Sequence, residues 1–108
     1  MTKFQNNDFQ AMKDWLISAF ANIEPVKSVY LIGSVLHKKQ KETNDIDVVQ
    51  QIQFEMNPTI TQHTKKISLI RDEFAKKFSK PLHITTFTQN ELEEFEEFMR
   101  KNTYIKLF

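Results

Sequence analysis

The chain has 108 residues, 40% of them hydrophobic, with 15 basic and 14 acidic side chains and a formal net charge of +1. This size and composition predict one domain, residues 1–108, around one modest core, and the balanced charge indicates no clear nucleic-acid patch. Cysteine is absent, which excludes disulfides and cysteine–zinc sites, and without a long apolar segment or a signal-peptide core we expect a cytoplasmic protein with no membrane partner.

The first third of the chain predicts a helix and then a strand. Residues that favour a helix N-cap occupy positions 6–8, and apolar side chains then recur at three- and four-residue steps until shortly before Pro25. The segment Val26–Ser34 is rich in β-branched and aromatic residues and contains, near its end, the only glycine of the chain, Gly33. It therefore predicts a strand that ends at this glycine.

A second strand is predicted after a polar segment. Residues 37–44 predict a loop or a short helical turn, and Asp45–Phe54 predicts the strand. Because side chains alternate along a strand, Asp45 and Asp47 share one face, and most of the apolar residues share the other.

The second half of the chain predicts helix, strand and helix. Asn57–Pro58 is a typical helix start, and Pro81 breaks that helix. Leu82–Thr88 predicts the third strand, and Thr88–Glu91 matches a capping box that begins a last helix with one apolar stripe and one acidic, solvated face. The tail Thr103–Phe108 could form a short strand. The order α-β-β-α-β-α predicts an α/β (α+β) domain in two layers, a small mixed sheet flanked by helices.

Gly33, Ser34, Asp45 and Asp47 form a candidate site. Residues two apart on a strand lie roughly 7 Å apart on one face, so the two carboxylates can converge on Mg²⁺ or Mn²⁺, hard cations that combine carboxylates with substrate phosphates. Glycine has no Cβ, so another backbone or a phosphate can approach closely, and Ser34 adds a hydroxyl beside backbone N–H groups that can face an anion. The alternative is a plain turn glycine near two solvated acids.

Gly33-Ser34, with Asp45-Ile46-Asp47 beginning twelve residues after the glycine, resembles the signature of the nucleotidyltransferase superfamily, the group that includes DNA polymerase beta. The spacing is similar to that of its small prokaryotic branch, the minimal nucleotidyltransferases. The motif covers roughly a fifth of the chain, and the element order extends the resemblance over most of it. Asn44 stands where the family often has Ser. The resemblance implies that Asp45 and Asp47 hold metal, and that Gly33 and Ser34 seat the β- and γ-phosphates of a nucleoside triphosphate.

Two features depart from the family pattern. Active members usually carry a third acid on a later strand, and the position that matches it here holds His83. Imidazole is a poorer Mg²⁺ ligand than a carboxylate but can act as a general base; the alternative is a partly buried strand histidine. Val35–Lys39 lacks the arginines that often follow Gly-Ser, and its lysines either meet phosphates or belong to a solvated loop. We expect His37 and His63 at the surface.

Three functions are compatible with the sequence. The first is transfer of a nucleoside monophosphate from a nucleoside triphosphate to a hydroxyl acceptor, with Asp45, Asp47 and His83 as the catalytic residues. The second is a catalytically weak or inactive binding module on the same fold, because minimal nucleotidyltransferases often partner a helical protein in toxin–antitoxin pairs. Such a module would bind a helical, toxin-like protein or a second copy of itself. The third is a generic α/β domain with no nucleotide site.

Overall fold

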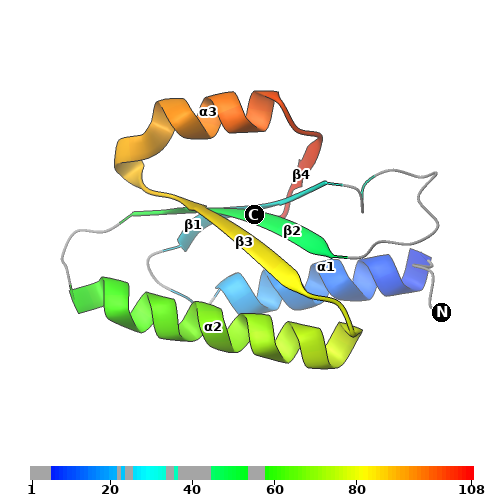
Figure 1. Cartoon of the computed structure of the whole chain (residues 1–108). Coiled ribbons are helices and arrows are strands. Elements are labelled where there is room, and N and C mark those ends of the chain that lie inside the picture. The colour runs from blue at the N-terminus through cyan, green and yellow to red at the C-terminus, as the bar shows by residue number, and fades with distance from the viewer. Residues whose placement is uncertain (1–5, 22, 24–25, 34–35, 37–44, 54–57) are drawn as a thin grey trace.

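The computed structural model describes residues 6–21, 23, 26–33, 36, 45–53 and 58–108, and it shows a four-stranded sheet with helices on both faces (Figure 1). The helices are α1 (Asn6–Ala21), α2 (Pro58–Phe78), the 3₁₀ helix η2 (Gln89–Glu91) and α3 (Leu92–Arg100). The strands are β1 (Val26–Ile32), β2 (Ile46–Ile52), β3 (Leu82–Phe87) and β4 (Tyr104–Lys106). The expected α-β-β-α-β-α order and the α+β class are confirmed, and the short C-terminal strand forms as β4.

The sheet is mixed, with the strand order β3-β2-β1-β4. β1 runs antiparallel to β2 and to β4, whereas β2 and β3 are parallel. A parallel pair needs a crossover connection, and α2 lies in that connection (Figure 1). This arrangement brings the end of β1 and the beginnings of β2 and β3 to one end of the sheet, where Ile32 is the partner of Asp47 and Asp47 is the partner of His83.

The helices form two separate layers on opposite faces of the sheet, so the expected two layers become three (Figure 1). The larger core cluster joins α1 and α2 to one face, through residues such as Leu16, Phe74 and Val48. The smaller cluster contains Ile32, Val49, Phe95 and Met99, and it joins α3 to the other face. β2 is therefore covered on both faces, and the simple alternation expected from its sequence underestimates its burial.

The chain reaches the second face through a capping box. Thr88 and Glu91 are paired as the sequence predicts: the backbone N–H and the hydroxyl of Thr88 donate to Glu91 Oε1, at 2.9 and 3.0 Å. This box opens η2 and leads directly into α3, whose side chains Phe95 and Met99 are buried. The four glutamates of α3, residues 93, 94, 96 and 97, are solvent-exposed as expected.

Helix α2 ends before Pro81 as the sequence predicts. Ser79 follows the helix with φ = 59°, a left-handed conformation, and its N–H donates to the carbonyl of Ala75. Such a residue closes a helix in the way that glycine usually does. Within the part of the chain that the structure describes, no helix is both long and apolar enough to cross a membrane.

Candidate functional site

Gly33 lies directly after β1 and has a positive φ of 92°. Its carbonyl accepts a hydrogen bond from the N–H of Leu36 at 3.1 Å, so the chain turns here. A Cβ added at this position would lie 2.9 Å from Asp47 Oδ2. The sequence predicted that glycine permits a close approach at the strand end, and the structure shows that the group approaching it is the carboxylate of Asp47.

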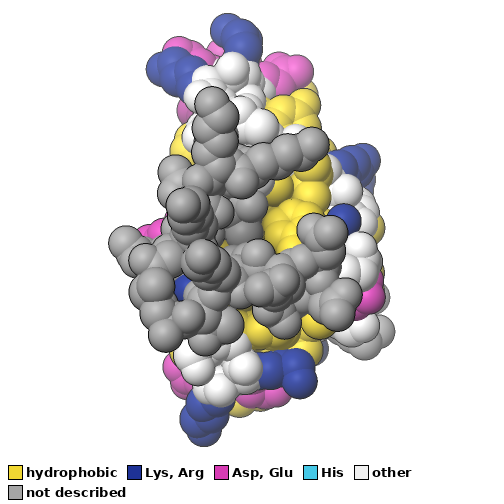
Figure 2. Space-filling view, turned by 90° about the vertical axis from the view of Figure 1, so that its right-hand side faces the viewer, with side chains coloured by type: hydrophobic (Ala, Val, Ile, Leu, Met, Phe, Trp, Pro, Cys, Tyr) yellow, Lys and Arg dark blue, Asp and Glu magenta, His cyan; other side chains and the backbone are white. Residues whose placement is uncertain are grey.

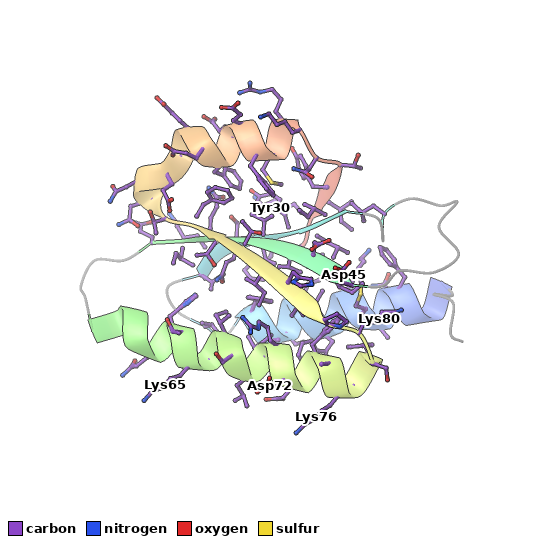
Figure 3. All side chains as sticks on the ribbon, in the orientation of Figure 1. Tyr30, Asp45, Lys65, Asp72, Lys76 and Lys80 are labelled. Carbon is purple, nitrogen blue, oxygen red and sulfur yellow. The ribbon has the colours of Figure 1, made fainter. Side chains whose placement is uncertain are left out.

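Asp47, His83 and Asp45 meet on the α3 side of the sheet. Asp47 and His83 are register partners in the parallel β2–β3 pair, so their side chains lie on the same face. The imidazole Nε2 of His83 is 3.2 Å from Oδ2 of Asp45, which immediately precedes β2 (Figure 3). The side chains of His83 and Asp45 are 59% and 42% exposed, so solvent and solutes reach this pair.

The electrostatics of Asp47 reflect this crowding. Burial raises the pKa of the Asp47 carboxyl above its ordinary value, and the nearby negative charge of Asp45 raises the pKa further. His83 acts in the opposite direction and lowers it. Positive charge would relieve the repulsion between two carboxylates in a partly buried position, and the imidazole of His83 lies beside Asp45.

The structure therefore brings together Gly33, Asp45, Asp47 and His83, four of the five residues that the sequence singled out. Ser34, the fifth, lies outside the described residues, and so do His37, Lys38, Lys39 and Asn44. The expectation of a surface position is wrong for His63, which is only 4% exposed on α2. Burial and the neighbouring Lys66 lower the pKa of His63 below its ordinary value. Sequence periodicity alone could have found this, because Ile60, Ile67 and Ile70 flank His63 at helical spacing.

The donor set decides which cations fit. Among the described residues, no group of three or more His, Asp or Glu side chains is arranged to hold a metal ion. Asp45 and Asp47 are two hard oxygen donors, and one of them is already paired with His83. Mg²⁺ commonly uses one or two carboxylates and completes its shell with substrate phosphates and water. The residues therefore fit one divalent cation held jointly with a phosphate-bearing ligand, and they do not form a complete site made by protein alone.

A groove of about 490 Å³ runs beside His83, along the free edge of β3. Its lining includes Arg71 and Asp72 of α2, together with His83 and Thr85 of β3. Figure 2 looks onto the end of the sheet that carries the candidate site: basic and acidic side chains both lie at the upper and lower margins, and hydrophobic side chains lie between them. The imidazole is thus open to a solute from the β3 edge.

No protein-family model matches the chain, and no curated protein matches it by sequence. The chain is similar in structure to a chain of the complex between a tri-AMPylated HEPN toxin of Shewanella oneidensis and an MNT antitoxin, with 15% sequence identity and a TM-score of 0.48. That match covers 72% of this chain and 55% of the other, so this chain spans little more than half the length of its counterpart.

The chain is also similar to a proposed nucleotidyltransferase from Sulfolobus solfataricus, with 15% identity and a TM-score of 0.44, over 88% of this chain and 76% of the other. Both likenesses concern the arrangement of the chain, whereas the chemistry of the site depends on this chain's own residues.

Proposed function

We propose that the chain binds a nucleoside triphosphate together with one divalent cation at Asp45 and Asp47, and that it transfers the nucleoside monophosphate to a hydroxyl acceptor. The observation that carries this proposal is the contact of Gly33 with Asp47: the turn glycine and the second acid of the Gly-Ser and Asp-x-Asp motif lie against each other. A plain turn glycine beside two solvated acids does not require this approach.

When bound, the cation would neutralise part of the negative charge of the phosphates. Asp45 and Asp47 would hold it, since both are carboxylates on the same side of the sheet and their mutual repulsion is relieved by positive charge. The backbone of the turn at Gly33 would seat the β- and γ-phosphates, since the carboxylate of Asp47 already occupies the space that a Cβ of this residue would take.

His83 is the candidate general base. In its neutral form an imidazole carries one N–H and one lone pair. If Nε2–H donates to Oδ2 of Asp45, the lone pair on Nδ1 is left to accept a proton, and Asp45 fixes the orientation of the ring. In the proposed step the acceptor oxygen attacks the α-phosphorus, the bond from that phosphorus to the bridging oxygen breaks, pyrophosphate leaves, and the acceptor proton passes to Nδ1.

A second function is favoured by one specific observation. By the resemblance, His83 stands where active members carry the third acid, and its Nε2 lies 3.2 Å from Oδ2 of Asp45. A negative charge that would help to hold a cation is then replaced by a group that competes for Asp45. General-base assistance is worth roughly 10²–10⁴-fold, and a weakened cation site loses electrostatic stabilisation in addition. The second candidate is therefore a catalytically weak or inactive module that acts by binding a helical protein or a second copy of itself.

One experiment separates the two functions. Labelled nucleoside triphosphate and Mg²⁺ are incubated with the wild type, His83→Ala, His83→Asp and the Asp45→Asn/Asp47→Asn double variant, and transfer of label is measured. The enzyme proposal predicts slow transfer by the wild type, less with His83→Ala, more with His83→Asp, and none with the double variant. Brisk transfer that ignores His83→Ala contradicts the role of His83 as the base. No transfer by any variant, with protein binding intact, favours the binding module.

A further inference from the structure

A second cavity lies at the end of the sheet opposite to Asp45, on the face that α3 covers. Its volume is about 420 Å³, and its lining includes Lys27, Ser28 and Tyr30 of β1, Gln51 of β2, Leu92 of α3 and Lys106 of β4. This volume is within the range of small-molecule sites, roughly 300–1,000 Å³. We refer to it as the Lys27–Lys106 cavity.

Both lysines are brought to the cavity by features of the sheet. The β1–β2 register pairs Val26 with Ile52 and Ser28 with Gln51, so two residues of β1 advance against one residue of β2. Lys27 is the extra residue of this irregularity. A bulge of this kind changes the direction in which a side chain points, and bulges are common beside functional sites. Lys106 is the register partner of Tyr30, and partners in an antiparallel pair point to the same face.

The floor of the cavity is held by hydrogen bonds. The Ser28 hydroxyl donates to Oε1 of Gln51 at 2.6 Å, and the Tyr30 hydroxyl lies 3.4 Å from the same oxygen. Ser28 is only 7% exposed. Because both hydroxyls engage the carbonyl oxygen of the Gln51 amide, its remaining hydrogen-bonding capacity is the pair of N–H donors on Nε2. The floor therefore presents donors in a fixed orientation.

Among the residues that the structure describes, the charged side chains of the lining have one sign: Lys27 and Lys106 are present, and no Asp or Glu is. Glu91 is close in sequence, but its Oε1 accepts from the backbone and hydroxyl of Thr88 and closes the capping box. Two ammonium groups and an amide donor favour an anion, because hydrogen bonds in which one partner is charged are stronger than those between neutral groups.

One wall of the cavity is apolar. Leu92 of α3 is 54% exposed, and both Leu92 and Tyr30 line the cavity. An exposed leucine and a tyrosine in one lining give an organic group apolar surface to pack against. The combination of a cationic side and an apolar side selects an anion that carries an organic group.

We propose that the Lys27–Lys106 cavity binds a phosphate-bearing small molecule, with Lys27, Lys106 and the amide of Gln51 at the phosphate and Leu92 against its organic part. This site is separate from the candidate nucleotidyl-transfer site, because Gln51 and Asp47 lie toward opposite ends of β2. The chemistry suits inorganic phosphate and a phosphorylated organic molecule alike, so the test uses both.

The test measures the melting temperature against increasing inorganic phosphate and increasing AMP, at constant ionic strength kept with NaCl. The proposal predicts that AMP raises the melting temperature in a saturable way, whether or not inorganic phosphate alone also does so. A ligand that binds only the native state stabilises it. The Lys27→Ala/Lys106→Ala variant should need at least about tenfold more AMP to reach the same rise in melting temperature. The matched control is Lys65→Ala/Lys76→Ala, which removes the same charge from α2 on the other face (Figure 3).

Two further results decide the outcome. The Asp45→Asn/Asp47→Asn variant should show the same AMP-dependent rise in melting temperature as the wild type. In NMR spectra of the wild type, AMP should shift the amide signals of Ser28, Gln51 and Thr88. The proposal is overturned if AMP gives no rise, if the α2 control loses the rise equally, or if the shifts centre on Gly33 and Asp47.

Discussion

Gly33 and Asp47 are in such close contact that a Cβ on the glycine would lie 2.9 Å from the carboxylate oxygen Oδ2. The two residues belong to neighbouring strands, with Gly33 directly after Ile32, the register partner of Asp47. Two structural features therefore favour glycine at position 33: its positive φ and the closeness of the Asp47 carboxylate, which leaves no space for a Cβ. These two causes can be measured separately.

Gly33→Ala should lower the free energy of unfolding by about 1–3 kcal/mol, the range for a non-glycine residue held at a strained backbone position. Repeating the change in an Asp47→Ala background removes the carboxylate but leaves the backbone strain. We therefore expect a smaller cost there, and urea unfolding of the four proteins gives the coupling energy. Equal costs in both backgrounds would show that the carboxylate does not limit this position.

Asp47→Asn should stabilise the fold near neutral pH. The folded-state pKa of Asp47 is raised, so the folded protein binds this proton more tightly than the unfolded chain does, and ionisation of Asp47 costs stability as the pH rises. Asparagine mimics the protonated form. The melting temperature of the variant should exceed that of the wild type at about pH 7, and the difference should vanish well below the ordinary value of 3.8.

Asp72→Asn is the matched control, because Asp72 is exposed on α2 (Figure 3). It should leave the melting temperature nearly unchanged at both pH values. A decrease in stability for Asp47→Asn at neutral pH would mean that the folded state favours the charged carboxylate, contrary to the effect of burial and of the neighbouring Asp45.

His63 should make the fold sensitive to mild acid. Its folded-state pKa is lowered by burial and by Lys66, so the contribution to stability is complete above the ordinary value of 6.5 and is lost as the pH falls from there through the lowered folded-state pKa. His63→Leu should flatten the fall in the urea midpoint between about pH 7.5 and 5. An unchanged slope in His63→Leu would contradict the prediction.

Ser79→Gly should stabilise the protein by about 0.5–1 kcal/mol. A left-handed conformation costs a non-glycine residue about 1–2 kcal/mol, and the greater freedom of glycine in the unfolded chain offsets part of that gain. Ser79 has φ = 59°. Thermal unfolding of Ser79→Gly and Ser79→Ala checks this, and Ala should not reproduce the gain.

Much of the fold follows from the sequence, because the signals are local. The Thr88–Glu91 capping box, the breaking effect of Pro81 and the strand alternation before Gly33 depend on neighbours in the chain. The third layer was not predicted, because whether α3 packs beside α2 or on the opposite face depends on which face of the sheet leaves Ile32 and Val49 uncovered.

The candidate site depends on a different kind of signal. Asp45, Asp47 and His83 are singled out by a resemblance to a motif, and the parallel β2–β3 register makes Asp47 and His83 partners. The Lys27–Lys106 cavity was not found, because nothing in a single lysine on a strand signals a register irregularity. Tertiary pairing had to be known before Lys27 and Gln51 could be related to each other.

The central claim is that Asp45 and Asp47 form a cation-dependent nucleotide site, and calorimetric titration of the protein with nucleoside triphosphate tests it most directly. Titrations are made with Mg²⁺, with EDTA, and with Mg²⁺ on the Asp45→Asn/Asp47→Asn variant, whose fold is checked by its melting temperature. We expect saturable binding by the wild type in Mg²⁺ only, and none by the folded double variant. Binding that is equally strong in EDTA, or that survives in the double variant, would contradict the claim.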